Sequence, residues 1–172
     1  MSKGFTQLRP IGCTSVAGVA ARSFRAPVDE PQYIRGLRLT GIQRCLYPEQ
    51  RFDSDPERRF AVLLEDEHED LKWFKPGKGQ LNIYYSADHS YEPDFIVETG
   101  TMKYLCEVKR VSEIDDDVVR EKGRAAATWC RYATAHAAEH DGKPWAYLLV
   151  PHTAISGTAT LADLANAYSV TA

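Results

Sequence analysis

The stretch YEPDFIVETGTMKYLCEVKR, residues 91–110, predicts a β-hairpin that carries charged side chains. A Gly-Thr pair at 100–101 separates two apolar runs, and a two-residue loop with glycine first is typical of a type II′ hairpin turn. This turn sets the strand pairing so that Asp94 faces Glu107. Directly opposed residues share a face of the sheet, with Cβ atoms about 4.5–5.5 Å apart. We therefore expect two carboxylates to lie side by side.

Lys109 is expected on the same face as the two acids, because alternate residues of a strand share a face. It follows Glu107 by roughly 6.6 Å at a rise of about 3.3 Å per residue. Ile96 and Leu105 make this face apolar farther along the hairpin. The opposite face carries Phe95, Val97, Tyr104, Cys106 and Val108. Both faces are thus expected to be covered, which places the charges at a partly buried end of central strands.

These three charged residues have two interpretations. One is a solvated strand end or a salt bridge, although Lys109 can neutralise only one of the acids. The other is a catalytic site, because Mg²⁺ prefers oxygen ligands and often takes only one or two carboxylates. A metal polarises a phosphoryl oxygen and lowers the pKa of a bound water, and a lysine can orient that water or stabilise the developing charge. Opposed acids favour the second interpretation.

The segments around the hairpin predict a mixed α/β domain. Ser54 and Glu57 form a capping-box pattern, which predicts a helix from about 55 to 66. The run LNIYY, residues 81–85, is a strand candidate that precedes the hairpin. A long helix is expected from about Asp117 to His140. Its predicted buried stripe consists of Val118, Val119, Ala126, Trp129, Cys130, Ala133 and Ala137.

The C-terminal part predicts one further strand and one further helix. The apolar run in GKPWAYLLVP follows a glycine stop and suggests a strand buried on both faces. A last helix is expected over about 160–168. The fold class is therefore α/β, with a mixed central sheet flanked by helices and an α-β-β-β-α-β order.

Composition limits the classes of function. The chain has 172 residues and a formal net charge of −3, which suits one domain and excludes a uniformly basic nucleic-acid binder. Four scattered cysteines and the lack of an apolar run of about 20 residues predict a cytoplasmic protein without a membrane span. Residues 1–50 lack clean periodicity and are interpreted as an N-terminal arm or linker, or as the remnant of a larger protein, with a short strand near Arg35–Thr40. Residues 51–172 form the expected domain.

At this point the motifs resemble a known family. EPDFIV followed by CEVK is similar to the signature of the PD-(D/E)xK nuclease superfamily, which has the restriction-endonuclease-like fold. FDSDPERRFAVLLED resembles the first core helix of that family. REKGRAAATWCRYA followed by GKPWAYLLVPHTAI resembles the C-terminal nuclease domain of type III restriction subunits and of related DEAD/DEAH-helicase-linked proteins. The resemblance covers about residues 50–165.

The resemblance implies roles for particular residues. Asp94 and Glu107 would bind Mg²⁺, for which Mn²⁺ can substitute, with the backbone carbonyl of Val108 as a further ligand. Lys109 would be the catalytic lysine. Glu57 would be an auxiliary catalytic acid, although its capping role beside Ser54 explains it equally well without a metal.

Lysines elsewhere are candidates for nucleic-acid binding. Lys122 matches a lysine early in the second helix of the family and could contact a DNA phosphate, but an exposed helical lysine is the simpler interpretation. Lys75 and Lys78 lie in the aromatic and basic loop WFKPGKGQ, which could contact a DNA backbone or form a plain hairpin turn. His136 and His140 are spaced as a metal-binding pair but are interpreted as surface residues.

Together these features predict a Mg²⁺-dependent DNA endonuclease of a restriction or phage-defence system. Type III restriction subunits cut only when a motor hydrolyses ATP, and this sequence has no Walker A loop. A separate helicase or ATPase is therefore an expected partner. The alternatives are a transposon-end-cleaving endonuclease of the same fold, and a non-catalytic module that binds DNA or a helicase.

Overall fold

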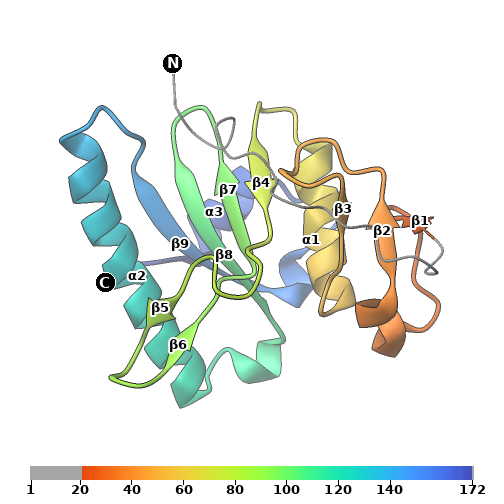
Figure 1. Cartoon of the computed structure of the whole chain (residues 1–172), viewed down its shortest axis with the longest axis horizontal. Helices are drawn as coiled ribbons and strands as arrows, with labels where there is room; N and C mark the ends of the chain where they lie inside the picture. The colour runs from red at the N-terminus through yellow and green to blue at the C-terminus, as the bar shows by residue number, and fades with distance from the viewer. Residues whose placement is uncertain (1–20, 172) are drawn as a thin grey trace.

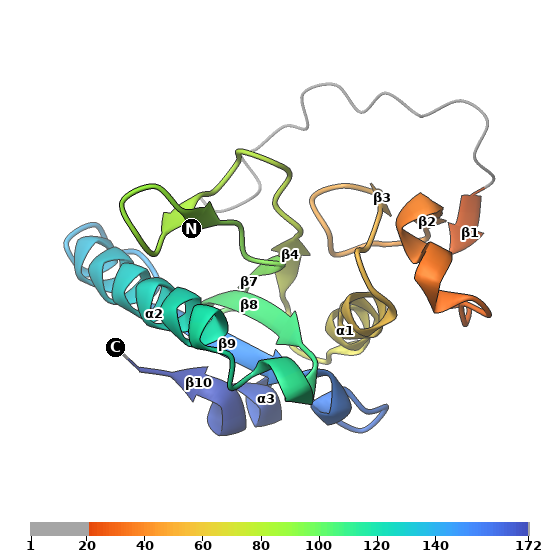
Figure 2. The same cartoon turned by 90° about the horizontal axis from the view of Figure 1, so that it is seen from below.

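The computed structural model describes residues 21–171, which form a mixed α/β structure. Its main sheet has five strands in the order β10-β9-β8-β7-β4. They are β4 (Lys72–Phe74), β7 (Phe95–Glu98), β8 (Lys103–Lys109), β9 (Trp145–Pro151) and β10 (Ser169–Val170). Only β8 and β9 pair in parallel, and the other neighbours are antiparallel, so the sheet is mixed as expected. Helices α1 (Asp55–Asp66) and α2 (Asp117–Ala138) lie on opposite sides of it (Figures 1 and 2).

The β7–β8 hairpin has the predicted register, but its turn is of another type. Ile96 pairs with Leu105, and the Thr99 N–H donates to Met102 O at 2.9 Å. Gly100 does not have the positive φ that a type II′ turn needs, so that prediction is wrong. The Thr99 hydroxyl instead accepts hydrogen bonds from the N–H groups of the third and fourth turn residues, at 3.3 and 3.1 Å. A threonine side chain thus stabilises the turn.

Helix α1 begins and ends where the sequence predicts. Ser54 is its N-cap, and its hydroxyl accepts a hydrogen bond from the Glu57 N–H. Pro56 occupies the first turn, where a missing N–H costs nothing. The apolar face of the helix, with Phe60 and Leu64 fully buried, packs against the sheet.

The third strand next to the hairpin is not the predicted one. Residues 81–85 contribute only β5 (Ile83–Tyr84), which pairs with β6 (Ser90–Tyr91) in a separate two-stranded sheet. The main sheet uses β4 instead, where Trp73 pairs with Val97 and is completely buried. The β-propensity of residues 81–85 favours a strand there, but the burial of Trp73 decides which segment joins the main sheet.

Helix α2 confirms the predicted length within two residues, but only Ala126 and Cys130 of its predicted buried stripe are buried. Gly123, Ala126, Ala127 and Cys130 are its buried residues. Val118 is 51% exposed, and the other predicted stripe residues, Val119, Trp129, Ala133 and Ala137, are partly buried. Asp116 is the N-cap but forms no side-chain capping bond, so the acidic run contributes charge near the helix start without that bond.

Two hydrophobic clusters cover the faces of the sheet. One unites α1 and α3 (Leu161–Tyr168) with residues such as Phe95 and Val150, and the other unites α2 with residues such as Leu105 and Tyr147. Strand β9 contributes to both clusters, as its apolar run predicts. The short 3₁₀ helices Val111–Glu113 and His152–Ala154 follow β8 and β9. None of the helices formed by residues 21–171 has both the length and the apolar character needed to span a membrane.

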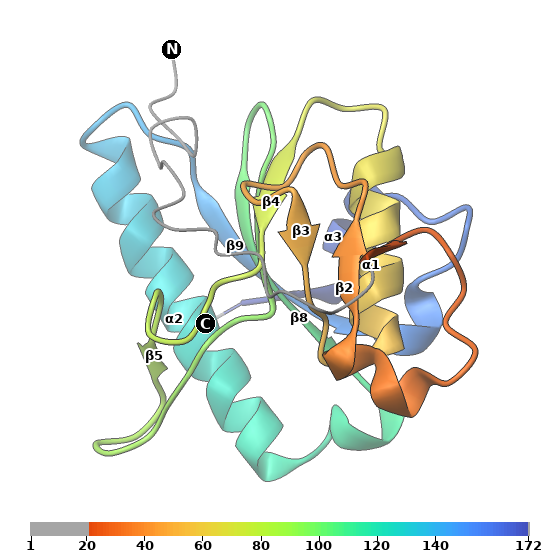
Figure 3. The same ribbon diagram turned by 45° about the vertical axis from the view of Figure 1, so that its right-hand side comes forward.

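The described part of the expected N-terminal arm is folded. Residues 21–50 form a three-stranded sheet with the order β1-β2-β3, from β1 (Ala21–Ser23), β2 (Arg38–Thr40) and β3 (Glu49–Gln50), plus a 3₁₀ helix at Pro31–Gly36 (Figure 3). Phe24, Ile34 and Leu39 are buried in the same cluster as α1. Residues 21–50 therefore belong to the main core and do not form a linker, while residues 1–20 lie outside the described part. Strand β2 confirms the strand expected near Arg35–Thr40.

Candidate active site

Three of the predicted catalytic residues meet at one end of the β7–β8 hairpin. Asp94 directly precedes β7, and Glu107 and Lys109 are the fifth and seventh residues of β8. Glu107 is buried at 5% exposure, Asp94 is half-buried and the Lys109 side chain is 26% exposed. The site therefore lies at the partly buried sheet end that the sequence predicts.

Asp94 is held in place by the neighbouring strand. Its Oδ2 accepts a hydrogen bond from the backbone N–H of Val108 at 2.8 Å. Since β7 begins only at Phe95, this carboxylate replaces the ladder partner that β8 lacks at this point. The bond fixes the Asp94 carboxylate beside Glu107, the residue before Val108.

Only one of the two carboxylate oxygens of Glu107 has a partner in the described structure. Its Oε1 forms an ion pair with the Lys109 ammonium at 2.8 Å, whereas its Oε2 is buried and has no hydrogen-bond partner among the described residues. A buried carboxylate oxygen without a partner is costly, unless an ion or a water molecule binds it. This oxygen and the Asp94 carboxylate are the kind of donors that would suit a divalent cation.

The electrostatics agree with a crowded pair of acids. Burial, together with the charges of Glu107 and Glu57, raises the pKa of Asp94 well above its ordinary value, and Lys75 and the Val108 N–H only partly oppose this effect. For Lys109, burial disfavours the charge, but the Glu107 carboxylate and Asp94 outweigh it and raise its pKa. Lys109 thus stays cationic, while Asp94 ionises with difficulty unless a cation is near.

The backbone carbonyl of Val108 lies on the β7 side of β8, where Asp94 also lies. In an antiparallel ladder, the N–H and C=O groups of one residue point to the same neighbouring strand. The Val108 N–H points to Asp94. Its carbonyl therefore points to the same side, just beyond the start of β7. Two carboxylates and one carbonyl form a small set of oxygen donors, and no cluster of three His, Cys, Asp or Glu metal ligands occurs within residues 21–171.

Glu57 lies at the N-terminus of α1, with both carboxylate oxygens occupied. Oε1 accepts from the Ser54 hydroxyl at 2.9 Å, and Oε2 accepts from the Asp53 N–H at 3.1 Å. Oε2 also forms an ion pair with the Lys75 ammonium at 2.9 Å. Glu57 is thus tied to the start of α1, but its carboxylate accepts from the Asp53 N–H and the Ser54 hydroxyl and not from the Ser54 N–H, so only half of the predicted capping box is present. Its effect on the pKa of Asp94 shows that it lies close enough to influence the site electrostatically.

The lysines predicted to bind DNA have three different environments. Lys75 is only 15% exposed and contacts Asp53 and Glu57, so it belongs to the acid cluster and not to an open DNA-binding loop. Lys78 is exposed in the loop before β5. Lys122 places its ammonium over the rings of Tyr85 and Tyr91, at 5.6 and 5.7 Å from their centroids.

Sequence reasoning missed the pairing of Lys75 with Glu57, and it also missed a buried ion pair at the far end of the hairpin. There Glu98, at 8% exposure, binds the Lys143 ammonium at 2.8 Å. The β7–β8 register places Glu98 opposite Lys103, which gave a signal for a charge pair, but Lys143 comes from the loop before β9. Its position depends on tertiary packing alone.

His136 and His140 are exposed near the end of α2, as interpreted from the sequence. Their rings stack at 4.3 Å between centroids, and His140 Nδ1 lies 2.8 Å from the His136 carbonyl oxygen. The pair is thus engaged in local helix contacts. Cys106 and Cys130 are buried in the core, as expected.

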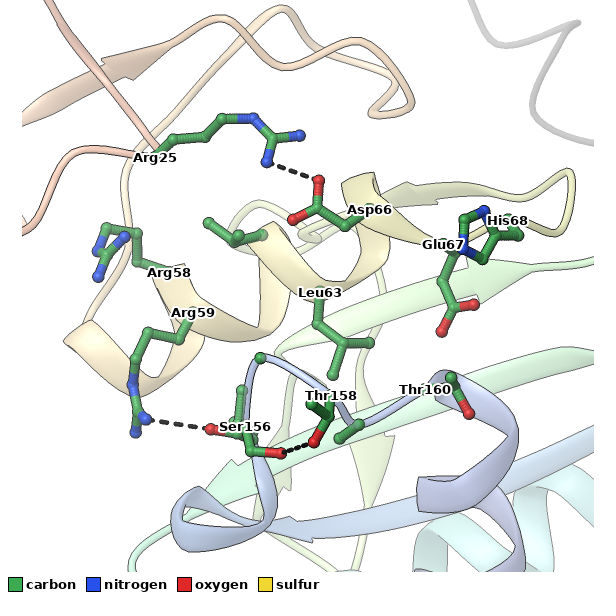
Figure 4. Close-up of a pocket in the computed structure, with 14 residues that line it drawn as sticks. Arg25, Arg58, Arg59, Leu63, Asp66, Glu67, His68, Ser156, Thr158 and Thr160 are labelled. Carbon is green, nitrogen blue, oxygen red and sulfur yellow. Dashed lines mark hydrogen bonds and ion pairs between the residues drawn. The ribbon is translucent and has the colours of Figure 1, made fainter.

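A cavity of about 730 Å³ lies elsewhere, between the outer surface of α1 and the segment 155–160 (Figure 4). None of the three hairpin residues lines it. Its arginines already have partners: Arg25 pairs with Asp66 at 2.6 Å, and Arg59 donates to two backbone carbonyls at 3.1 Å. The cationic side chains Arg25 and Arg59 of this cavity are therefore already paired within the fold.

Comparison of the chain with protein-family models, with curated proteins and with solved structures gave no match.

Proposed function

We propose that this chain is a metal-dependent DNA endonuclease that hydrolyses phosphodiester bonds. The observation that carries the proposal is the arrangement of Asp94, Glu107 and Lys109, in which one buried Glu107 oxygen has no partner among the described residues. The ion pair with Lys109 leaves this second oxygen buried and without a partner in the described structure. A free, buried oxygen beside a second acid is suited to a divalent cation.

The residues divide the chemistry between them. Asp94, Glu107 and the Val108 carbonyl would hold Mg²⁺ or Mn²⁺, and a bound ion of this kind supplies Lewis-acid polarisation of a phosphoryl oxygen and a water of lowered pKa. Lys109 keeps its proton at neutral pH because of its acidic neighbours. Its ammonium is therefore available to stabilise negative charge on the phosphate or to orient the attacking water.

The finer fold assignment belongs to the same proposal. In the main sheet the chain order is α1, β4, β7, β8, α2, β9, which is the helix, three strands, helix, strand order of the PD-(D/E)xK superfamily. The motif residues also lie at the ends of adjacent antiparallel strands, as that signature implies. A separate helicase or ATPase as partner, and a place in restriction or phage defence, follow from the resemblance to type III restriction nuclease domains.

The test is cleavage of supercoiled and linear DNA by the purified chain with Mg²⁺ or Mn²⁺. We expect cleavage to need the metal and to be lost in both Asp94→Asn and Lys109→Ala. Cleavage that continues unchanged in both variants would refute the proposal. If the wild-type chain alone is inactive, Mn²⁺ binding that disappears in Asp94→Asn distinguishes a nuclease that needs a motor from a non-catalytic module.

A further inference from the structure

Lys75 is at the centre of a second charge cluster, on the α1 side of the site. It follows β4 directly, and its ammonium lies 2.9 Å from Glu57 Oε2 and 3.0 Å from Asp53 Oδ2. Its side chain is only 15% exposed, and Asp94 contributes to its electrostatic environment. A lysine fixed in this way acts as a permanent cation beside the catalytic acids.

The two glutamates near Asp94 differ in what they still need. Both oxygens of Glu57 accept hydrogen bonds, and an ammonium ion neutralises its charge. Glu107 has a neutralising partner for one oxygen, while the other is buried with none in the described structure. The carboxylate that still lacks a cationic partner for one oxygen is therefore Glu107 and not Glu57.

A second divalent ion, bridging Asp94 and Glu57, would lie next to the Lys75 ammonium. Like charges at such close range disfavour each other strongly in a partly buried site. It would also have to displace the Ser54 and Asp53 donors that now bind Glu57.

We infer that Lys75 is a built-in counter-cation that keeps Glu57 from binding metal and restricts the site to a single divalent ion. The inference rests on the proposed function, since it specifies how the same acids use their metal. Glu57 then positions Lys75 and caps α1, and only Asp94, Glu107 and the Val108 carbonyl contact the ion.

The other end of the hairpin offers a matched control. Lys143 also pairs with a buried glutamate, Glu98, at 2.8 Å, and its side chain is 22% exposed. Lys143→Met and Lys75→Met both remove a lysine from a buried ion pair. Only the second does so beside Asp94.

The experiment is a Mn²⁺ titration of the full chain without DNA. Binding is measured by calorimetry and by the electron paramagnetic resonance signal of free Mn²⁺. The number of ions at the site is the number bound by each variant minus the number bound by the same variant that also carries Asp94→Asn. We expect one ion per chain in the wild type and in Lys143→Met. We expect two in Lys75→Met, and one again when Glu57→Gln is combined with Lys75→Met.

Two ions in the wild type, or one in a folded Lys75→Met variant, would overturn the inference but leave the proposed nuclease intact. No ion in the wild type would remove the proposed function as well. If Lys75→Met does not fold, the Mn²⁺ affinity of the Glu57→Gln variant tests the inference instead. This substitution should change Mn²⁺ affinity by less than about 3-fold, against the roughly 10–100-fold loss that follows removal of groups that orient metal ligands. A loss of tenfold or more would show that Glu57 serves the metal.

Discussion

The carboxylate of Asp94 accepts a hydrogen bond from the backbone N–H of Val108, with 2.8 Å between Oδ2 and N. The same side chain thus serves two purposes: it completes the hydrogen bonding of β8, and it presents a negative charge beside Glu107. The two purposes can be separated by substitution, because an asparagine keeps the acceptor and removes the charge.

Asp94→Asn should leave the metal-free protein as stable as the wild type or more stable by up to about 1 kcal/mol, because it relieves repulsion between neighbouring acids. Asp94→Ala should cost about 1–3 kcal/mol, since the buried Val108 N–H loses its partner. Urea denaturation in the presence of a chelator measures both. A large loss in Asp94→Asn would show that the charge itself stabilises the fold.

The raised pKa of Asp94 predicts a pH dependence of the metal-free protein. The folded-state pKa lies above the ordinary value of 3.8, so the folded chain holds this proton more tightly than the unfolded chain. The protonated Asp94 side chain therefore stabilises the fold fully below pH 3.8, and this stabilisation is lost as the pH rises through the folded-state pKa. We expect the free energy of unfolding of the wild type to decrease over this range relative to Asp94→Asn. Parallel pH profiles for the two proteins would contradict the shift.

Lys109→Met should separate metal binding from catalysis. The substitution frees Glu107 Oε1 from its ion pair, so Mn²⁺ affinity should be kept or increased. Cleavage should fall by roughly 10²–10³-fold, the usual loss when a group that stabilises transition-state charge is removed. Calorimetric titration and a cleavage assay on the same sample provide the two measurements. Loss of Mn²⁺ binding would place Lys109 among the groups that hold the site together.

Lys143→Met should destabilise the protein without affecting the metal site. The substitution removes the ammonium that lies 2.8 Å from the buried Glu98 carboxylate, and the Lys103 ammonium lies farther away, at 4.0 Å. Breaking a buried ion pair of this kind costs about 3 kcal/mol. Denaturant unfolding should show this loss, while the Mn²⁺ stoichiometry stays at the wild-type value.

Phe24→Ala tests whether residues 21–50 belong to the main folding unit. Phe24 is 1% exposed within the cluster that includes α1, and truncation of a buried phenylalanine costs about 3–5 kcal/mol. Tyr33→Ala is the control, because Tyr33 is 65% exposed and should change stability little. A single cooperative transition that shifts in Phe24→Ala is the expected result. An unchanged midpoint would show that this segment folds separately.

The hairpin could be predicted from sequence because its information is local. The residues that face each other, such as Ile96 and Leu105, are set by the short loop that joins the two strands. The register was therefore correct even though the turn type was not. Helix α1 was predictable for a similar reason, since Ser54 and the apolar periodicity both act within a few residues.

The parts that were not predicted depend on contacts distant in sequence. Strand β4 has only three residues, and it belongs to the main sheet through its pairing with β7, in which Trp73 lies opposite Val97. Lys75 was interpreted as a loop lysine because nothing near it in sequence indicates that it meets Glu57, eighteen residues earlier. The packing of Phe24 on α1 has no periodic signal either. In each case tertiary burial decides the structure where local propensity is weak.

The parallel pairing of β8 with β9 continues to its last residue, where Lys109 lies opposite Pro151. The strand that carries Glu107 and Lys109 is therefore anchored by neighbours along one full edge and covered on both faces. Chemistry placed on such a strand is preorganised, and a ligand has little scope to reshape it. Under the proposed nuclease function, discrimination among DNA molecules would then fall to the exposed loops around the sheet end, which are not held by this strand pairing.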